Sequence, residues 1–287
     1  DHILSTTPIT NNATATYTRV GEATIEDWEG TQHIVPDGEL RWMGARRTEN
    51  LLTYSEDFSN AAWVKTNVIV TANTTTAPDG TLTADNLRES GATNIHNAYQ
   101  VGFVVTVGGY YTFTTYIKKN EHKVVQLSFA LSGGTFTTND WANFDVEAGT
   151  LGNIGSGASA AIQDAGNGWY RCTVTAIAAA TASSGVTICL TNNIDVAGRN
   201  PSYTGDGTSG IYIWGAQVEN VTNQSIKTAA DYVATTTTAV TKWFDTTQNG
   251  DLLRPIGWQD GRMLYDTYAP WEAAEAVTVG KRKKVDV

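Results

Sequence analysis

Alternation of apolar and polar residues is the main pattern along this chain, and it is clearest between residues 211 and 218. Ile211 and Ile213 fall on one side of an extended strand, because successive side chains in a strand point to opposite faces. Tyr212 and Trp214 fall on the other side. Since both faces carry large apolar groups, the strand is expected either to be covered on both sides or to present one face as an aromatic platform.

Similar short apolar segments recur roughly every ten residues through the middle of the chain, separated by turn signals such as Pro78-Asp79-Gly80. This spacing is typical of a β-sandwich. We predict strands at 68–72, 84–89, 97–101, 110–118, 123–130, 141–145, 150–151, 158–164, 169–178, 185–190 and 210–218.

The two ends have a different pattern. Residues 1–14 are rich in Thr and Asn and are interpreted as a poorly structured lead-in. Residues 234–238 are interpreted as a threonine-rich linker, and the aromatic stretch 244–271 predicts one or two further hairpins. A small β meander is predicted at 15–18, 23–28, 31–35 and 40–42.

The sequence therefore predicts three regions. These are an N-terminal lead-in and small β meander for docking or oligomerisation at 1–46, a β-sandwich at 47–235, and an aromatic β extension with a basic tail at 236–287.

Composition supports an all-β globular protein. Thr, Val, Ile, Tyr and Trp dominate the apolar segments, and no long amphipathic helix or heptad run is present. The net charge of −10 argues against a nucleic-acid partner, which requires a basic surface. No apolar run approaches the roughly 20 residues of a membrane span, so membrane insertion is not expected. The basic tail at 281–284 is interpreted either as a solvated terminus or as a segment that docks onto an acidic neighbour.

The two cysteines are predicted to be free thiols. Cys172 shares a strand face with Tyr170 and Val174, whereas Cys189 lies opposite Ile188 and Leu190. If the two segments pair as a hairpin, the thiols project to opposite sides and cannot be bridged without a bulge.

Four sequence blocks carry a specific resemblance. They are RTENLLTYSEDFSNAAWVK at 47–65, TAPDGTLTAD at 76–85, GNGWYRCTVT at 166–175 and YTGDGTSGIYIWGAQVE at 203–219. Together they resemble the head spike or tail fibre module of tailed-bacteriophage virion proteins. That module is similar in layout to jelly-roll carbohydrate-binding modules of the family 4/9 type.

The resemblance implies a jelly-roll β-sandwich in a non-enzymatic structural protein located in the virion, contacting host-surface glycans and other virion proteins. It implies a symmetric homo-oligomer, a trimer in a tail fibre or a pentamer in a head spike. It also implies a structural Ca²⁺ near the first and last strands, where Glu56 or Asp57 would lie near Glu219. Carboxylate oxygens are ligands that Ca²⁺ prefers.

Sugar binding requires a flat aromatic face flanked by hydrogen-bonding groups. The candidates are Tyr212 and Trp214 on the strand at 210–218, and Tyr203 in a loop. For Trp214, as for Trp169, core packing is the favoured interpretation, because aromatic residues dominate protein cores. Three further candidates lie together in a polar loop, namely Asn139, Asp140 and Trp141.

No catalytic motif appears, and the four histidines have no metal-ligand spacing. We therefore expect no enzymatic activity. Two alternatives stay open from the sequence alone: a purely architectural virion protein with buried aromatics, and a polysaccharide depolymerase with two carboxylates facing each other in a cleft.

Overall fold

The computed structural model describes residues 3–4, 21, 23–26, 32–35, 45–130, 132–224 and 227–245. The chain divides into two compact units. One, here called the sandwich unit, comprises Glu49–Thr222 and Lys227–Val240. The other, called the flanking unit, comprises Asp1–Thr48, Asn223–Ile226 and Thr241–Val287.

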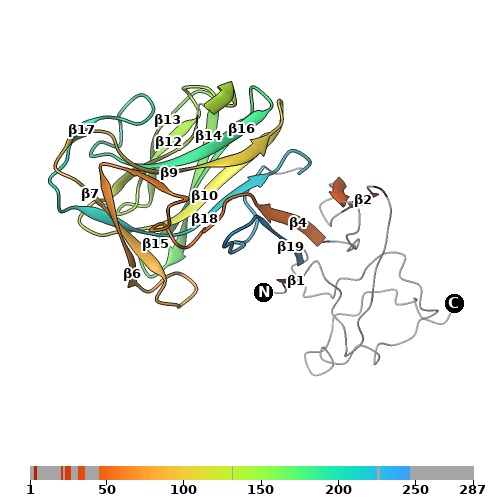
Figure 1. Cartoon of the computed structure of the whole chain (residues 1–287), viewed down its shortest axis with the longest axis horizontal. Helices are drawn as coiled ribbons and strands as arrows, with labels where there is room; N and C mark the ends of the chain where they lie inside the picture. Colours follow the sequence, from red (N-terminus) through yellow and green to blue (C-terminus); the bar gives the residue numbers. More distant parts are fainter. Residues whose placement is uncertain are drawn as a thin grey trace. The chain divides into compact units, whose positions relative to one another are not determined.

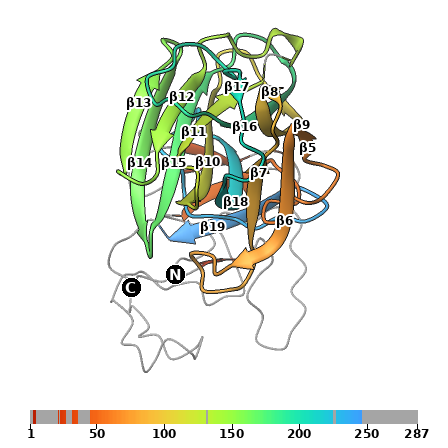
Figure 2. The ribbon, with the colours of Figure 1, turned by 90° about the vertical axis from the view of Figure 1, so that its left-hand side faces the viewer.

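The sandwich unit consists of two six-stranded antiparallel sheets (Figures 1 and 2). The β18 sheet has the order β14-β15-β10-β18-β7-β6, and the β16 sheet has the order β13-β12-β11-β16-β9-β5. The strands of the β18 sheet are β6 (Val68–Thr75), β7 (Ala84–Glu89), β10 (Tyr110–Lys119), β14 (Ala158–Gly166), β15 (Trp169–Ile177) and β18 (Gly210–Asn220). Those of the β16 sheet are β5 (Val64–Thr66), β9 (His96–Val105), β11 (Val124–Phe129), β12 (Trp141–Asp145), β13 (Thr150–Ile154) and β16 (Ala182–Leu190).

This topology is a jelly roll. The chain passes repeatedly from one sheet to the other, so that two four-stranded arrays result, β7-β18-β10-β15 and β9-β16-β11-β12. Two short strands, β8 (Thr93–Asn94) and β17 (Tyr203–Thr204), pair beside them, and a short 3₁₀ turn follows β11 at Ser132–Gly134. The predicted all-β jelly-roll fold is confirmed. No helix in the described part of the chain is long and apolar enough to cross a membrane.

Outside the two six-stranded sheets, β1 (Ile3–Leu4), β19 (Val240–Asp245) and β4 (Ala45–Asn50) form a three-stranded sheet, and β2 (Ala23–Glu26) and β3 (Gln32–Val35) form a hairpin. The predicted lead-in at 1–14 is therefore wrong in part, because Ile3–Leu4 pairs with β19. The strands predicted at 15–18 and 40–42, the hairpins at 246–271 and the basic tail lie outside the described residues.

The core lies between the two sheets and is built from buried aliphatic and aromatic side chains, including Phe113, Leu127 and Phe129. Both cysteines are buried free thiols, as predicted. The assumed hairpin is wrong, because Cys172 lies on β15 and Cys189 on β16, in different sheets. Burial raises the pKa of the Cys189 thiol to about 12, so it is inert at neutral pH.

Strand β18 is covered on both faces. Ile213 packs into the core between the sheets, and Trp214 packs on the opposite side. Gly215 then adopts a φ of +64°, and the pairing with β10 shifts register between Thr114 and Tyr116. This bulge reverses the phase of alternation, so that Ala216 enters the core next.

The threonine-rich stretch at 234–238 is not a linker. The backbone N–H groups of Tyr54 and Ser55 donate to the carbonyls of Thr236 (2.7 Å) and Thr235 (3.2 Å). Val233, just before it, is completely buried. The stretch is therefore held by backbone hydrogen bonds as part of the sandwich unit.

We predict that Gly215→Ala destabilises the fold by about 1–3 kcal/mol, because a non-glycine residue is strained at this φ. The added Cβ would also lie 3.1 Å from Tyr116 Cδ2 and 3.4 Å from the Tyr232 ring. Gly80→Ala is the control, since Gly80 has a φ of +88° but nothing within 4 Å of the added Cβ. Urea unfolding measures both, and an equal loss for the two variants would contradict the role of the ring contacts.

Candidate carbohydrate-binding site

Trp214 does not form an aromatic platform. It is 4% exposed, and its ring lies 4.6 Å from that of Tyr232. Its indole Nε1 donates to Thr83 Oγ1 at 3.0 Å. Core packing therefore describes Trp214, and a ring this buried cannot stack on a sugar. Tyr212, next to it on β18, is half-buried at the edge of the same aromatic cluster.

Residues 227–235 cover this outer face of the β18 sheet and are called the strap. The Val233 N–H donates to Gln217 Oε1 at 2.6 Å, and Gln217 Nε2 donates to the Asp231 carbonyl at 3.1 Å. The Ala230 N–H donates to Glu219 Oε1 at 2.9 Å. The polar side chains on this face are thus used to hold the strap.

The loop group around Trp141 is also structural. Trp141 is 5% exposed, whereas Asn139 is exposed. Asp140 is buried, and its Oδ2 accepts a hydrogen bond from the Thr137 N–H at 2.5 Å. Burial raises the pKa of the Asp140 carboxyl. The carboxylate closes the turn that precedes β12, and the indole beside it lies under the surface.

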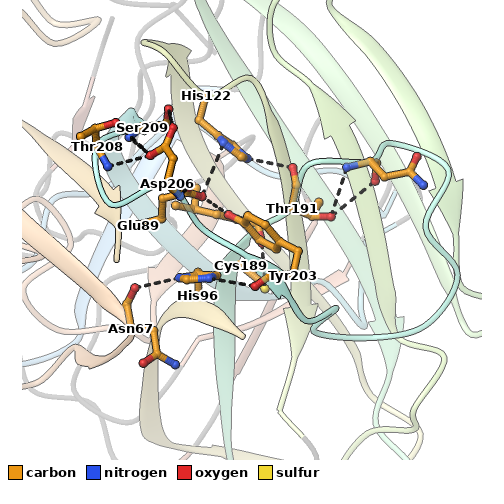
Figure 3. Close-up of polar contacts among 12 residues, drawn as sticks. Asn67, Glu89, His96, His122, Cys189, Thr191, Tyr203, Asp206, Thr208 and Ser209 are labelled. Atoms are coloured by element: carbon orange, nitrogen blue, oxygen red, sulfur yellow. Dashed lines mark hydrogen bonds and ion pairs between the residues drawn. The ribbon is translucent and has the colours of Figure 1, made fainter. Parts of the chain in front are cut away.

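Tyr203 lies between two histidines (Figure 3). Its ring centroid is 4.7 Å from that of His96 and 6.1 Å from that of His122. Its hydroxyl donates to Glu89 Oε2, and the Asp206 N–H donates to Glu89 Oε1 at 2.7 Å. Burial and this hydrogen bond raise the pKa of Tyr203, so its hydroxyl stays a donor. Glu89, Tyr203 and Asp206, here called the Glu89 clamp, fix this loop, and the ring of Tyr203 is half-buried against His96.

The motif Asp206-Gly207-Thr208-Ser209 forms the loop after Tyr203. Asp206 Oδ1 accepts from the backbone N–H groups of Thr208 (2.6 Å) and Ser209 (2.7 Å), and Oδ2 accepts from Ser209 Oγ at 2.5 Å. These bonds hold the pKa of the Asp206 carboxyl well below its usual range. The motif therefore forms a side-chain-stabilised turn leading into β18.

The carboxylates expected to bind calcium each have partners within the protein. Asp57 Oδ1 accepts from Ser59 Oγ (2.6 Å) and the Asn60 N–H (3.1 Å), whereas Glu219 holds the strap. Glu56 is half-buried and interacts with the Tyr232 hydroxyl. No group of three His, Cys, Asp or Glu side chains suited to a metal ion occurs among the described residues.

A cation already lies near Asp57. The Lys65 ammonium donates to the carbonyls of Ser59 (2.7 Å) and Asn60 (2.6 Å). Desolvation lowers the pKa of Lys65, and the carboxylates of Asp57 and Asp85 offset only part of this shift. The oxygen-rich turn that follows Asp57 is therefore occupied by an ammonium group of the protein itself.

A partly exposed aromatic ring lies instead on the outer face of the β16 sheet. Because Ala98 points into the core, Tyr99 points outward, where it is half-buried. Its direct cross-strand neighbours are Thr187 on β16 and Val64 on β5. Val64 and the next outward residue of β9, Val101, are 41% and 52% exposed, so the ring borders an open apolar surface.

Arg199 reaches this face from the loop at 191–202. Its Nε donates to the Phe129 carbonyl at 2.9 Å and its Nη2 to Thr187 Oγ1 at 3.3 Å. The loop is held on the sheet because the Asn200 N–H donates to Gln126 Oε1 at 2.6 Å and Asn143 Nδ2 donates to the Val196 carbonyl at 2.9 Å. The guanidinium therefore lies over the cross-strand neighbour of Tyr99.

Asn97 completes the face. It is 7% exposed, directly opposite the exposed Thr66 on β5, and its buried Oδ1 has no hydrogen-bond partner in the described part of the chain. We call Val64, Asn97, Tyr99, Thr187 and Arg199 the Tyr99 face. It combines an aromatic ring, apolar surroundings, an amide acceptor and a guanidinium donor, which suits a sugar. The sequence prediction missed it; the alternation of β9 marks Tyr99, but no local signal places Arg199.

Comparisons with known proteins do not assign this chain to a family. No family model matches the chain, and no curated protein matches it. Among solved structures it is similar to the enzymatically active domain of bacteriophage CBA120 tailspike protein 4, with 14% identity and a TM-score of 0.38 over 59% of this chain but only 21% of the tailspike chain.

It is also similar to the CBM22-1 xylan-binding domain of Paenibacillus barcinonensis Xyn10C, with 11% identity, a TM-score of 0.33, and coverage of 60% of this chain and 92% of that domain. The C-terminal CBM6 of LamC from Zobellia galactanivorans has 7% identity and a TM-score of 0.31, over 61% of this chain and 100% of that module. Similarity at this level assigns neither a ligand nor a role.

We predict that Glu89→Gln costs about 1–3 kcal/mol of folding stability, because an amide N–H₂ replaces one acceptor of a buried group that receives two hydrogen bonds. Tyr203→Phe is the control, since it removes one donor and leaves the Asp206 N–H on Glu89. Its cost should be smaller. Urea unfolding compares them, and a larger loss for Tyr203→Phe would contradict the central role of the carboxylate.

Asp206 gives a pH-dependent prediction. Its folded-state pKa is depressed, so its stabilising effect is present above the unfolded value, about 3.9, and is lost as pH falls through the folded pKa. The difference in unfolding free energy between wild type and Asp206→Asn should therefore be largest at pH 7 and should shrink below about pH 4. Unfolding curves of both proteins at pH 7 and pH 3 check this; a difference that does not change with pH would contradict it.

Proposed function

We propose that this chain is a non-enzymatic structural protein of a bacteriophage virion and that its sandwich unit binds glycans of the host surface. The observation that carries the glycan-binding part is the Tyr99 face. The virion part is supported by the four sequence blocks that resemble phage head spike or tail fibre proteins. These blocks run from 47 to 219 and so fall almost entirely within the sandwich unit.

The chemistry of the Tyr99 face matches what a sugar requires. The apolar side of a pyranose can lie on the Tyr99 ring, with Val64 and Val101 excluding water at its edge. The sugar hydroxyls can exchange hydrogen bonds with Arg199 and Asn97. The strands hold Tyr99 and Asn97 in fixed positions before the ligand arrives, which lowers the entropic cost of binding.

The mechanism that follows is multivalent attachment. A shallow site on a sheet face binds a single sugar weakly, and many copies on one particle raise the overall avidity without new contacts. We propose that the flanking unit joins the sandwich to other virion proteins and to further copies of the chain. A trimer would suit a fibre and a pentamer a vertex spike.

We predict that Tyr99→Ala weakens binding to a responsive glycan at least about tenfold, which corresponds to about 1.4 kcal/mol. The control is Tyr212→Ala, which removes another half-buried tyrosine from the outer face of the opposite sheet. A glycan array first identifies the ligand, and titration calorimetry then measures both variants. Equal weakening by the two variants, or no effect of Tyr99→Ala, would contradict the site.

A second candidate function is purely architectural. It is favoured by the burial of all four tryptophans whose side chains are described, Trp63, Trp141, Trp169 and Trp214. Cryo-electron microscopy of the intact particle separates the two functions. Copies that project outward with Tyr99 on a free surface would support attachment, whereas copies with that face packed against other virion proteins would support architecture.

A further inference from the structure

The guanidinium of Arg199 is only partly used by the protein. A guanidinium has five N–H groups. Two of them donate to protein oxygens, at Phe129 and Thr187, which leaves three without a protein acceptor in the described part of the chain. Arg199 is half-buried, and burial lowers its pKa.

Arg199 also has no carboxylate partner among the described residues. The ion pairs there join Lys119 and Lys123 to Glu147, Lys123 to Asp145, and His122 to Glu89. A guanidinium that is partly removed from water and has no counter-ion lacks the pairing that such groups usually have in proteins. The site is therefore electrostatically incomplete in a chain with a net charge of −10.

We infer that the Tyr99 face selects sugars that carry a carboxylate, with the free N–H groups of Arg199 as its partner. This inference rests on the proposed glycan-binding function. A planar carboxylate accepts two parallel hydrogen bonds from a guanidinium, and these are stronger than bonds to neutral hydroxyls. Thr187 lies beneath the guanidinium and directly opposite Tyr99, so a sugar stacked on the ring has its substituents near Arg199.

Asn97 provides independent support for a sugar acid over a simple anion. Its buried Oδ1 is an acceptor without a donor, and a carboxylate has no hydrogen to give. A sugar hydroxyl has one. Asn97 and Tyr99 point to the same side of β9 and are two residues apart, about 7 Å along the strand. One uronic or sialic acid residue therefore offers a carboxylate for Arg199 and a hydroxyl for Asn97.

The test uses the full-length protein and matched polymers. Polygalacturonate, alginate, hyaluronan and polysialic acid are each compared with their carboxyl-reduced forms, in which the acid becomes a primary alcohol. Wild type should bind at least one acidic polymer about tenfold or more tightly than its reduced form, because bonds to a charged partner are the stronger kind. Raising the salt concentration should reduce this preference.

Two variants locate the effect. Arg199→Gln should remove the preference, so that the ratio of the affinity for the acidic polymer to that for its reduced form falls to about one. Arg199→Lys should keep part of the preference, since an ammonium retains the charge but not the bidentate geometry. Because carboxyl reduction changes the ligand and not the protein, the comparison stands even where a variant folds poorly.

The outcomes separate the two proposals. Equal affinity for acidic and reduced polymers overturns the carboxylate inference and leaves glycan binding in place. Tighter binding to sulfated polymers such as dextran sulfate than to the carboxylated ones overturns it as well, because the anion would then be a sulfate ester. Absence of binding to every acidic and neutral polymer overturns both the inference and the proposed function.

Discussion

The hydrogen bonds to the buried carboxylate of Glu89 hold β17 and the loop that follows it in place on the sandwich unit. Glu89 is the last residue of β7, it is 3% exposed, and it receives hydrogen bonds from Tyr203 and Asp206. A buried carboxylate is costly unless donors surround it, so the loop after β17 has one low-energy arrangement. The segment carrying Arg199 ends at β17, whose Tyr203 donates to Glu89. The position of Arg199 is therefore fixed at one side by Gln126 and Asn143 and at the other by Glu89.

The sequence predicted strand limits well where apolar and polar residues alternate clearly and turn residues lie on both sides of the strand. Strands 84–89 and 141–145 have the predicted limits, and the jelly-roll fold follows from many such strands. It was uninformative where contacts are long-range. The segment at 234–238 has a linker composition, and only the folded chain brings Thr235 and Thr236 to the N–H groups of Ser55 and Tyr54.

The candidate site was missed for a related reason. Tyr99 and Trp214 both lie on alternating strands, and alternation says which side chains share a face but not which face a distant segment covers. The strap covers Trp214, and nothing in β18 itself encodes that. Trp141 and Tyr203 were candidates because their neighbours in the sequence are polar. Asp140, next to Trp141, is buried and closes a turn, and the hydroxyl of Tyr203 donates to Glu89, which is distant in the sequence.

Polar side chains on the two outer faces divide into those that hold a covering segment and those that do not. Gln217 and Glu219 are occupied by the strap, and Gln126 and Asn143 by the loop at 191–202. Unpaired atoms elsewhere, such as Arg171 Nε and Trp141 Nε1, lie beneath covering backbone at Ala230 and Gly155.

Asn97 differs from these groups, because its cross-strand neighbour Thr66 on β5 is exposed, and Arg199 keeps N–H groups without a protein acceptor in the described part of the chain. An unmet hydrogen-bonding group beside open surface can be satisfied by a ligand, whereas one beneath the chain cannot. This distinction, and not the number of aromatic residues, is the reason for proposing the Tyr99 face as the binding surface of the sandwich unit.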